Sequence, residues 1–361
     1  MTGVWPATHG VYANQKFDPL GSLHGEAITE ASTVKVKTLW QAAHDAGYTT
    51  ASVGFPVTTG AAGIDWLMPA NAAFEGRSEE GSAAPADPNR HYDHPAGLRE
   101  TLAPDLAGMK DVDIEHTRFA WTLAILRRYK PELMTTHIGD LDHAEHATGP
   151  FSAESFATME FLDQQVATLM EVERTIDPDA IIAIVSDHGF EPVEKTFNIN
   201  VLFSEAGLMG KDVWKAAPWI TGGTAAVVLK DPKDADVLKQ VRVLLDKAAA
   251  TPEYGIAAVL SHDELVRRGG SPEASFLVEM KPGYKFGTAR QGKVLVEGKR
   301  TGTHGYLPER PELRASFLMV GKGIAHGRDL GVIDMRVIAP TLAAVLGVKL
   351  EAAEKPAMRV R

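Results

Sequence analysis

Apolar residues follow two different spacings that alternate along the chain, and this alternation predicts an α/β fold. Short runs that contain apolar and β-branched residues and are typical of strands occupy residues 49–55, 132–140, 180–187 and 314–321. Apolar residues at the three- and four-residue spacing of amphipathic helices occur in 34–47, 114–130, 153–176 and 335–347. The run AIIAIVSD (180–187) is almost entirely apolar, which is typical of a strand buried on both faces of a parallel sheet. We therefore expect a doubly wound, mostly parallel sheet between helices.

The pattern changes between residues 192 and 301, where it indicates a smaller α+β unit. Its apolar runs and its charged helix are 224–231, 256–261, 275–280 and 235–249. We expect residues 1–191 and 302–361 to form the core, with 192–301 inserted as a subdomain. Residues 72–95 are polar and rich in Gly, Pro and Ala, so we expect a flexible, lid-like loop there.

Composition narrows the possible functions. The chain has 361 residues, a net charge of −10, and no run of Lys or Arg, which argues against tight binding to a nucleic-acid polymer. A small anionic substrate is compatible with this net negative charge if a bound metal ion supplies positive charge at the site. The absence of Cys excludes disulfides and thiolate ligands, and leaves the compartment open. The sequence has no run of 18 or more apolar residues, so it predicts no transmembrane helix.

The segment GDLDHAEHATGP carries the first candidate metal ligands. Asp142 and His146 are four residues apart, just past a predicted strand and leading into a helix. One helical turn places both side chains on the same face, where they can bind one cation. The alternative is a polar loop in which Asp142 caps the next helix and His146 is solvated.

The segment IVSDHGF adds a second pair. Asp187 and His188 follow a strongly apolar strand, and Gly189 allows a sharp turn at the edge of the sheet. A kink there would send both side chains to one metal ion. The alternative is that Asp187 caps a turn.

A third candidate lies in GTHGYLPERPELRASFLMVG, where His304 sits in a Gly-flanked turn shortly before a buried strand. Alone it is compatible with a structural or solvated role. Together, two carboxylates and three imidazoles at successive strand ends favour a dinuclear, zinc-type site, because open α/β sheets place ligands there. His143 and His137 are left out: the first faces away from its neighbours, and the second lies within a predicted strand.

These three segments, in this order, resemble those of the alkaline phosphatase superfamily, and more narrowly its type I phosphodiesterase and nucleotide pyrophosphatase branch. The resemblance extends to TGVWPATHGVYAN near the start, GFPVTTGAAGIDWLMP, and VIAPTLAAVLG near the end. It implies an alkaline-phosphatase-like sheet between helices, with two zinc ions about 4 Å apart at the strand ends. Other divalent metals remain possible.

The resemblance also assigns roles. The first zinc ligands would be Asp142, His146 and His304, and the second would be Asp187 and His188. Asn14 stands where the family has an Asn that hydrogen-bonds a phosphoryl oxygen. Glu145 is a departure, because Gly is common at that position.

The family's Thr or Ser nucleophile, and a first strand ending in a further Asp ligand, would both precede Thr2. We therefore expect this sequence to be N-terminally shortened and inactive as it stands.

The expected activity is zinc-dependent hydrolysis of phosphodiester or pyrophosphate bonds in small, nucleotide-like substrates. Trp66 and Phe74 are candidates to contact a nucleotide base, although a role in the core is the alternative for both. Phosphomonoesterase, phosphonate hydrolase and sulfatase activities remain open, the last weakened by the absence of Cys. A non-catalytic metal-binding protein is the alternative of a different class. The physiological substrate, the oligomeric state and the compartment are not determined by the sequence.

Overall fold

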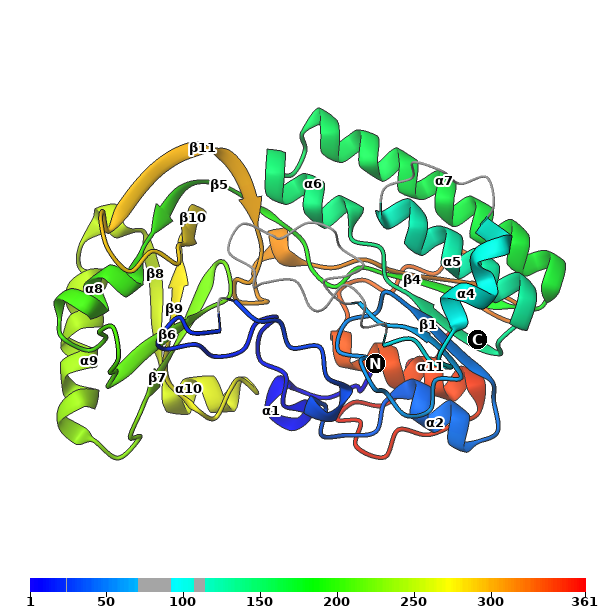
Figure 1. Ribbon diagram of the computed structural model, residues 1–361, viewed down its shortest axis with the longest axis horizontal. Coiled ribbons are helices and arrows are strands. Elements are labelled where there is room, and N and C mark those ends of the chain that lie inside the picture. Colours follow the sequence, from blue (N-terminus) through cyan, green and yellow to red (C-terminus); the bar gives the residue numbers. More distant parts are fainter. Residues whose placement is uncertain (24, 71–91, 107–113) are drawn as a thin grey trace.

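The protein has two lobes that meet near the middle of the molecule (Figure 1). The computed structural model describes residues 1–23, 25–70, 92–106 and 114–361. Both ends of the chain lie in the right-hand lobe of Figure 1, and the left-hand lobe is built from the middle of the chain. Most of the expected lid, residues 72–91, lies outside the described residues, so the lid stays a prediction.

A parallel sheet organises the right-hand lobe. The central strand β1 (Thr50–Val53) pairs in parallel with β2 (Trp66–Met68) on one side and with β3 (Leu133–Thr136) on the other. All four residues of β1 are buried. The helices α4 (Leu98–Leu102) and α5 (Ile114–Tyr129) pack against this sheet and complete an apolar core with it. The chain thus has the α/β class that the alternating pattern predicts.

The strands β4 (Ile181–Val185) and β12 (Phe317–Gly321) form a separate antiparallel ladder. Within the described part of the chain, neither of them is hydrogen-bonded to β1, β2 or β3. The expectation that 180–187 would be a strand buried on both faces is wrong: Ile184 is 38% exposed and Val185 is 45% exposed. Among the described residues this ladder has no third strand, so these two side chains keep part of their surface exposed.

Helices flank both ladders. The α6 helix (Asp140–Thr148) and the α7 helix (Ala153–Ile176) lie above β4 in Figure 1. The short α1 helix (Pro6–His9) lies below, near α2 (Leu39–Asp45) and α11 (Ile338–Leu346), and the last two pack together around Leu39 and Ala343.

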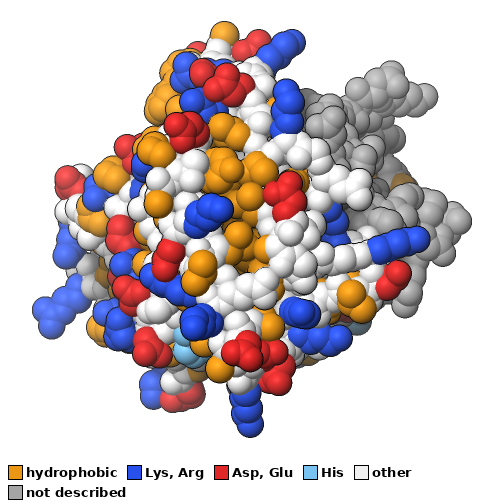
Figure 2. Space-filling view, turned by 90° about the vertical axis from the view of Figure 1, so that its left-hand side faces the viewer, with side chains coloured by type: hydrophobic (Ala, Val, Ile, Leu, Met, Phe, Trp, Pro, Cys, Tyr) orange, Lys and Arg blue, Asp and Glu red, His pale blue; other side chains and the backbone are white. Residues whose placement is uncertain are grey.

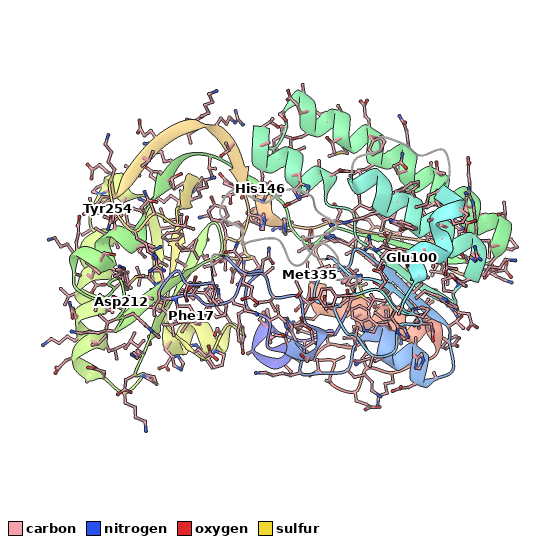
Figure 3. All side chains as sticks on the ribbon, viewed as in Figure 1. Phe17, Glu100, His146, Asp212, Tyr254 and Met335 are labelled. Atoms are coloured by element: carbon pink, nitrogen blue, oxygen red, sulfur yellow. The ribbon has the colours of Figure 1, made fainter. Side chains whose placement is uncertain are left out.

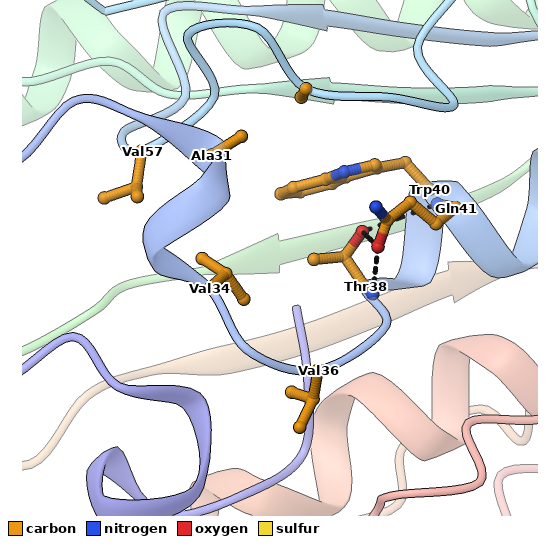
Figure 4. Close-up of a pocket in the computed structure, with 8 residues that line it drawn as sticks. Ala31, Val34, Val36, Thr38, Trp40, Gln41 and Val57 are labelled. Carbon is orange, nitrogen blue, oxygen red and sulfur yellow. Dashed lines mark hydrogen bonds between the residues drawn. The ribbon is translucent and has the colours of Figure 1, made fainter.

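The start of α2 differs from the expected helix at residues 34–47. The helix begins at Leu39 because the side chain and backbone of Thr38 form a reciprocal capping box with Gln41. Figure 4 shows both residues beside Trp40. Val34 and Val36 line a small cavity with Trp40 instead of extending the helix. Apolar spacing alone does not distinguish a helix face from the wall of such a cavity.

The left-hand lobe contains an antiparallel sheet in the order β6-β7-β9-β8. Its strands are β6 (Ala216–Ile220), β7 (Thr224–Leu229), β8 (Ile256–Ser261) and β9 (Ala274–Met280). Its helices are α8 (Ile199–Glu205), α9 (Ala235–Ala249) and α10 (His262–Arg267). The sheet and helices of this lobe enclose an apolar core, in which residues such as Val227, Val241 and Val278 have no exposed surface. The boundaries 192 and 301 of the inserted subdomain stay a prediction.

A second three-stranded sheet connects the lobes. Strand β5 (Glu191–Phe197) pairs in parallel with β10 (Gly283–Phe286) and antiparallel with β11 (Leu295–Thr303). The long β11 strand arches from the left-hand lobe toward α6 (Figure 1). Short 3-10 helices occupy Ala31–Thr33, Ala103–Leu106, Pro252–Tyr254, Pro311–Leu313 and Met335–Val337.

The surface of the left-hand lobe carries acidic and basic side chains interspersed among apolar ones (Figure 2). This face therefore presents no extended basic stripe of the kind that binds a nucleic-acid polymer. Among the described helices, none is both long enough and apolar enough to cross a bilayer.

Candidate metal centre

Three distant segments of the chain bring the five predicted metal ligands together where the lobes meet. Helix α6 carries Asp142 and His146, the turn after β4 carries Asp187 and His188, and His304 directly follows β11. Figure 3 shows His146 at this junction, beside the end of β11. The strand-end and helix-turn placements are those the sequence predicts.

One carboxylate oxygen faces three imidazoles. Oδ1 of Asp142 lies 3.5 Å from Nε2 of His146, 3.5 Å from Nε2 of His304 and 3.9 Å from Nε2 of His188. Possible ligand atoms of Asp142, His188 and His304 all lie within 4.8 Å of one another. Two ligands of a tetrahedral zinc ion are about 3.3 Å apart, so the donor types and their separations fit such an ion.

The second pair continues the same cluster. Oδ2 of Asp187 lies 3.5 Å from Nε2 of His188, and the His188 ring stacks on that of His304 with centroids 3.8 Å apart. His188 thus lies between Asp142 and Asp187 and is close to both carboxylates. The division of the five side chains between two ions stays a prediction, because His188 can join either group.

Backbone carbonyls orient two of the imidazoles. Nδ1 of His146 lies 3.2 Å from the carbonyl oxygen of Gly302, and Nδ1 of His188 lies 3.2 Å from that of Gly189. A carbonyl can only accept, so each Nδ1 carries the proton and donates it. The lone pair of each ring is then on Nε2, the atom that faces the cluster.

Burial and neighbouring charge act on the protonation of the site. Burial, with smaller contributions from His188 and His146, lowers the pKa of His304 to about 3. His304 is therefore a neutral imidazole near neutral pH, which is the form that binds a metal. Burial, together with the nearby charge of Asp142, raises the pKa of Glu145, the residue that departs from the family pattern.

Close backbone approaches fix the two turns that carry His188 and His304. A Cβ at Gly189 would lie 2.1 Å from the carbonyl oxygen of Glu312. Gly305 has φ +77°, and a Cβ there would lie 1.7 Å from the carbonyl oxygen of Thr221. Both positions require glycine because no side-chain carbon fits the space, and they hold His188 and His304 in place from the adjacent residue.

The remaining predicted residues lie elsewhere or outside the described part. Asn14 is exposed, and its backbone carbonyl accepts a hydrogen bond from the amide of Ile28. Trp66 stacks on Tyr129, with centroids 4.5 Å apart and planes at 14°, and packs against the core around β1. Phe74 lies outside the described residues. The roles of Asn14, Trp66 and Phe74 toward a substrate stay predictions.

Two further residues lie at the centre: His137, which the sequence analysis considered and left out, and Phe190, which it did not consider. Nε2 of His137 lies 4.0 Å from Oδ2 of Asp187. β3 ends at Thr136, so His137 is the first residue past a strand, and the strand-end rule could have found it. Phe190, which contacts three of the imidazoles, carried no signal because an apolar residue after Gly189 fits any buried strand.

Comparison with solved structures supports the fold. Human ectonucleotide pyrophosphatase/phosphodiesterase 5 superposes with a TM-score of 0.65 at 17% identity, over 100% of this chain and 83% of that chain. Its murine counterpart, an inactive variant in complex with AMP, gives 0.65 at 15% identity over 99% and 83%. Phosphonoacetate hydrolase from Sinorhizobium meliloti, in complex with phosphonoacetate, gives 0.58 at 20% identity over 88% and 76%. At these identities the likeness shows the fold alone.

Sequence comparison supplies the family. An uncharacterized pyrophosphatase/phosphodiesterase of Schizosaccharomyces pombe is 24% identical over 219 residues, which are 59% of this chain and 39% of that protein. The match thus spans less than half the length of this curated relative. The sequence model of the type I phosphodiesterase / nucleotide pyrophosphatase family matches residues 1–307. The chain therefore belongs to the type I phosphodiesterase / nucleotide pyrophosphatase family.

Proposed function

We propose that the protein is the metal-binding part of a zinc-dependent hydrolase that cleaves phosphodiester or pyrophosphate bonds in small, nucleotide-like substrates. The observation that carries this proposal is the Oδ1 atom of Asp142, which faces the Nε2 atoms of three histidines within 3.9 Å. Family membership supports the class of reaction. The similarity to a structure that binds AMP supports a small phosphorylated substrate.

In the proposed site, Asp142, His146 and His304 hold one divalent cation, and Asp187 and His188 hold a second. When bound, such ions supply positive charge that stabilises phosphoryl oxygens and lowers the pKa of an attacking hydroxyl. The chain's own contribution is orientation. His146 and His188 donate from Nδ1 to carbonyl groups and so present Nε2. Asn14 would donate a hydrogen bond to a non-bridging oxygen that gains charge in the transition state.

The proposal takes the hydroxyl nucleophile from a Thr or Ser outside these 361 residues, and places a strand that ends in a further Asp ligand between β3 and β4. Three features support this. Among the described residues, β3 is hydrogen-bonded only to β1, and β4 only to β12, so each strand has one edge without a partner strand. Ile184 and Val185 of β4 are exposed although apolar. His137 and Asp187, just past the ends of β3 and β4, lie 4.0 Å apart, which keeps the two strand ends close.

Metal content tests the proposal on the chain as it is. The 361-residue protein, stripped with chelator and dialysed against Zn²⁺, is expected to retain tightly bound zinc. Asp142→Ala and His304→Ala are expected to lose it, and Asp329→Ala, which removes an exposed surface carboxylate, serves as the control. Zinc retention that is equal in all four proteins would contradict the site.

Activity tests the finer statement. Hydrolysis of bis-p-nitrophenyl phosphate is expected only from a longer protein that includes both the nucleophile segment and the strand that ends in the further Asp ligand. Phosphonoacetate is the second substrate to assay, because the similarity to phosphonoacetate hydrolase favours phosphonate cleavage as the second candidate. If the extended protein binds zinc but cleaves neither substrate, the alternative of a non-catalytic metal-binding protein replaces the proposal.

A further inference from the structure

We infer that Phe190 is a positioning residue of the metal centre, an aromatic wall that fixes the orientation of three imidazoles at once. This inference rests on the proposed metal site and deepens it. Phe190 is the residue between the Asp187–Gly189 turn and strand β5, so the chain places it at the centre of the cluster. It is an apolar side chain, 7% exposed, among groups that are otherwise polar.

The Phe190 ring contacts three of the histidines at inclined angles. Its centroid lies 4.9 Å from that of His146, with the planes at 78°. The corresponding values are 5.3 Å and 67° for His304, and 5.6 Å and 54° for His188. All three separations lie in the range that attractive aromatic pairs prefer, and the rings of His146 and His304 meet Phe190 edge to face, whereas that of His188 is tilted. No other ring in the described part is recorded in contact with all three of these imidazoles.

The position of the Phe190 ring is itself fixed by the backbone around it. A Cβ at Gly302 would lie 3.0 Å from Cδ1 of Phe190 and 2.3 Å from the carbonyl oxygen of Glu145. Gly302 therefore allows β11 to approach both α6 and the ring. Because the ring has only two side-chain torsions and is enclosed between these segments, it offers a rigid surface to the histidines.

The Phe190 ring matters because one hydrogen bond does not fix the orientation of an imidazole ring. His146 and His188 each donate one Nδ1 hydrogen bond, of 3.2 Å, to a carbonyl. One such bond restrains a ring at a single atom and allows it to rock about that contact. Contact with Phe190 removes this motion and keeps each Nε2 aimed at Asp142. Mutation of a group that supports a metal ligand typically weakens metal binding about 10- to 100-fold.

The test uses the purified 361-residue chain with Zn²⁺ and Co²⁺ as probes. We expect Phe190→Ala to weaken zinc binding about 10- to 100-fold, with altered intensity in the visible absorption of bound Co²⁺. Phe190→Leu keeps an apolar side chain of intermediate size and is expected to recover part of the affinity. Phe203→Ala is the matched control: Phe203 is fully buried in the left-hand lobe, so its loss is expected to lower the melting temperature but leave zinc affinity unchanged.

A metal-free measurement keeps the inference separate from the proposed function. In protein labelled with ¹⁵N-histidine, each of His146, His188 and His304 is expected to give one sharp set of ring signals, and Phe190→Ala is expected to broaden or split them. Unchanged ring signals in Phe190→Ala, or an equal loss of zinc affinity in Phe203→Ala, would overturn the positioning role. Failure of the unmutated chain to bind zinc would instead refute the metal site, and the ring signals would still decide the role of Phe190.

Discussion

Two sheets of similar composition are buried to very different degrees in this molecule. In the left-hand lobe, Val227 of β7 and Val278 of β9 have no exposed surface. In the right-hand lobe, Val185 of β4 is 45% exposed and Leu318 of β12 is 55% exposed. Both pairs of strands are rich in apolar residues, so composition does not account for the difference.

The difference arises from what surrounds each strand. β7 and β9 are the inner strands of a four-stranded sheet, and Val241 and Leu245 of α9 are buried in the same core. β4 and β12 have only each other as hydrogen-bonded partners among the described residues. In the neighbouring α7 helix, Ser155 is the only residue that is itself buried. An apolar run thus specifies a strand, but neighbours on both sides and both faces are needed to bury it.

The metal centre lies on the border between these two environments. The backbone carbonyl of His304 accepts a hydrogen bond from the amide of Gly223 in the β6–β7 turn of the left-hand lobe. The side chain of His304 is 20% exposed, whereas that of Asp187, past the end of β4, is 67% exposed. The predicted ligand on the closed side is therefore much less exposed to solvent than the one on the open side. The two sides are therefore expected to respond differently to pH and to substitution.

The largest expected effect is the pH dependence of stability that His304 introduces on the closed side. Its pKa is lowered to about 3, so between pH 6.5 and about 3 the unfolded chain binds a proton that the folded chain excludes. In metal-free protein, the free energy of unfolding should therefore fall as pH falls through this window, by about 1.4 kcal/mol per pH unit from this group. Urea denaturation of His304→Gln is expected to show a shallower fall, and equal slopes would contradict the burial of His304.

Two ion pairs give the next contrast. On the closed side, Nε of Arg310 lies 2.9 Å from Oε1 of Glu279, with side chains 15% and 10% exposed. Arg310→Met leaves the Glu279 carboxylate buried without its partner and should cost about 3–5 kcal/mol. On the open side, Lys322 and Asp179 pair at the surface with side chains 68% and 56% exposed, so Lys322→Met should leave the free energy of unfolding nearly unchanged. Comparable losses in the two variants would refute the contrast.

Matched leucine truncations test the packing directly. Leu245 in α9 is 1% exposed, and Leu245→Ala should lower the free energy of unfolding by about 2–5 kcal/mol through the cavity it leaves. Leu318→Ala in β12 removes a side chain that is already more than half exposed, and should cost below about 1 kcal/mol. Chemical denaturation measures both. A loss at Leu318 that equals the loss at Leu245 would mean that β12 is covered in solution.

The smallest expected effect is at the contact between the lobes. Gly269 follows α10 in the left-hand lobe with φ +70°, and its carbonyl accepts a hydrogen bond from the amide of Ala7. A Cβ there would lie 2.3 Å from the ring of Trp5. Gly269→Ala should therefore cost about 1–3 kcal/mol. Gly323→Ala is the control: it has a similar φ of +77° but nothing within 4 Å of its Cβ, so a larger loss there would argue against the contact with Trp5.

Much of the secondary structure could be predicted from the spacing of apolar residues. The α7 helix spans Ala153–Ile176, the range expected, and α11 ends before Gly347 in a left-handed conformation. The start of α2 could not be predicted by spacing, because Val34 and Val36 line a cavity and the Thr38–Gln41 capping box sets the boundary. Capping depends on hydrogen bonds that a periodicity does not contain.

The candidate site divides in the same way. Their positions at predicted strand ends identified five candidate ligands, and these lie in one cluster: Asp142, His146, Asp187, His188 and His304. The same rule passed over His137, because the end of β3 was expected several residues later than Thr136. Phe190 could not be recognised at all, since its role depends on rings from two other segments, α6 and the residue after β11.

The sequence by itself determined the order of strands and helices and the chemical identity of the groups at the strand ends, because spacing and residue type are local properties. Only the tertiary structure decided how deeply His304 is buried, which ring supports the histidines, and that β4 and β12 stay half-exposed. Those outcomes depend on which distant segments pack against each residue, and packing between segments far apart in the chain is not encoded in any one of them.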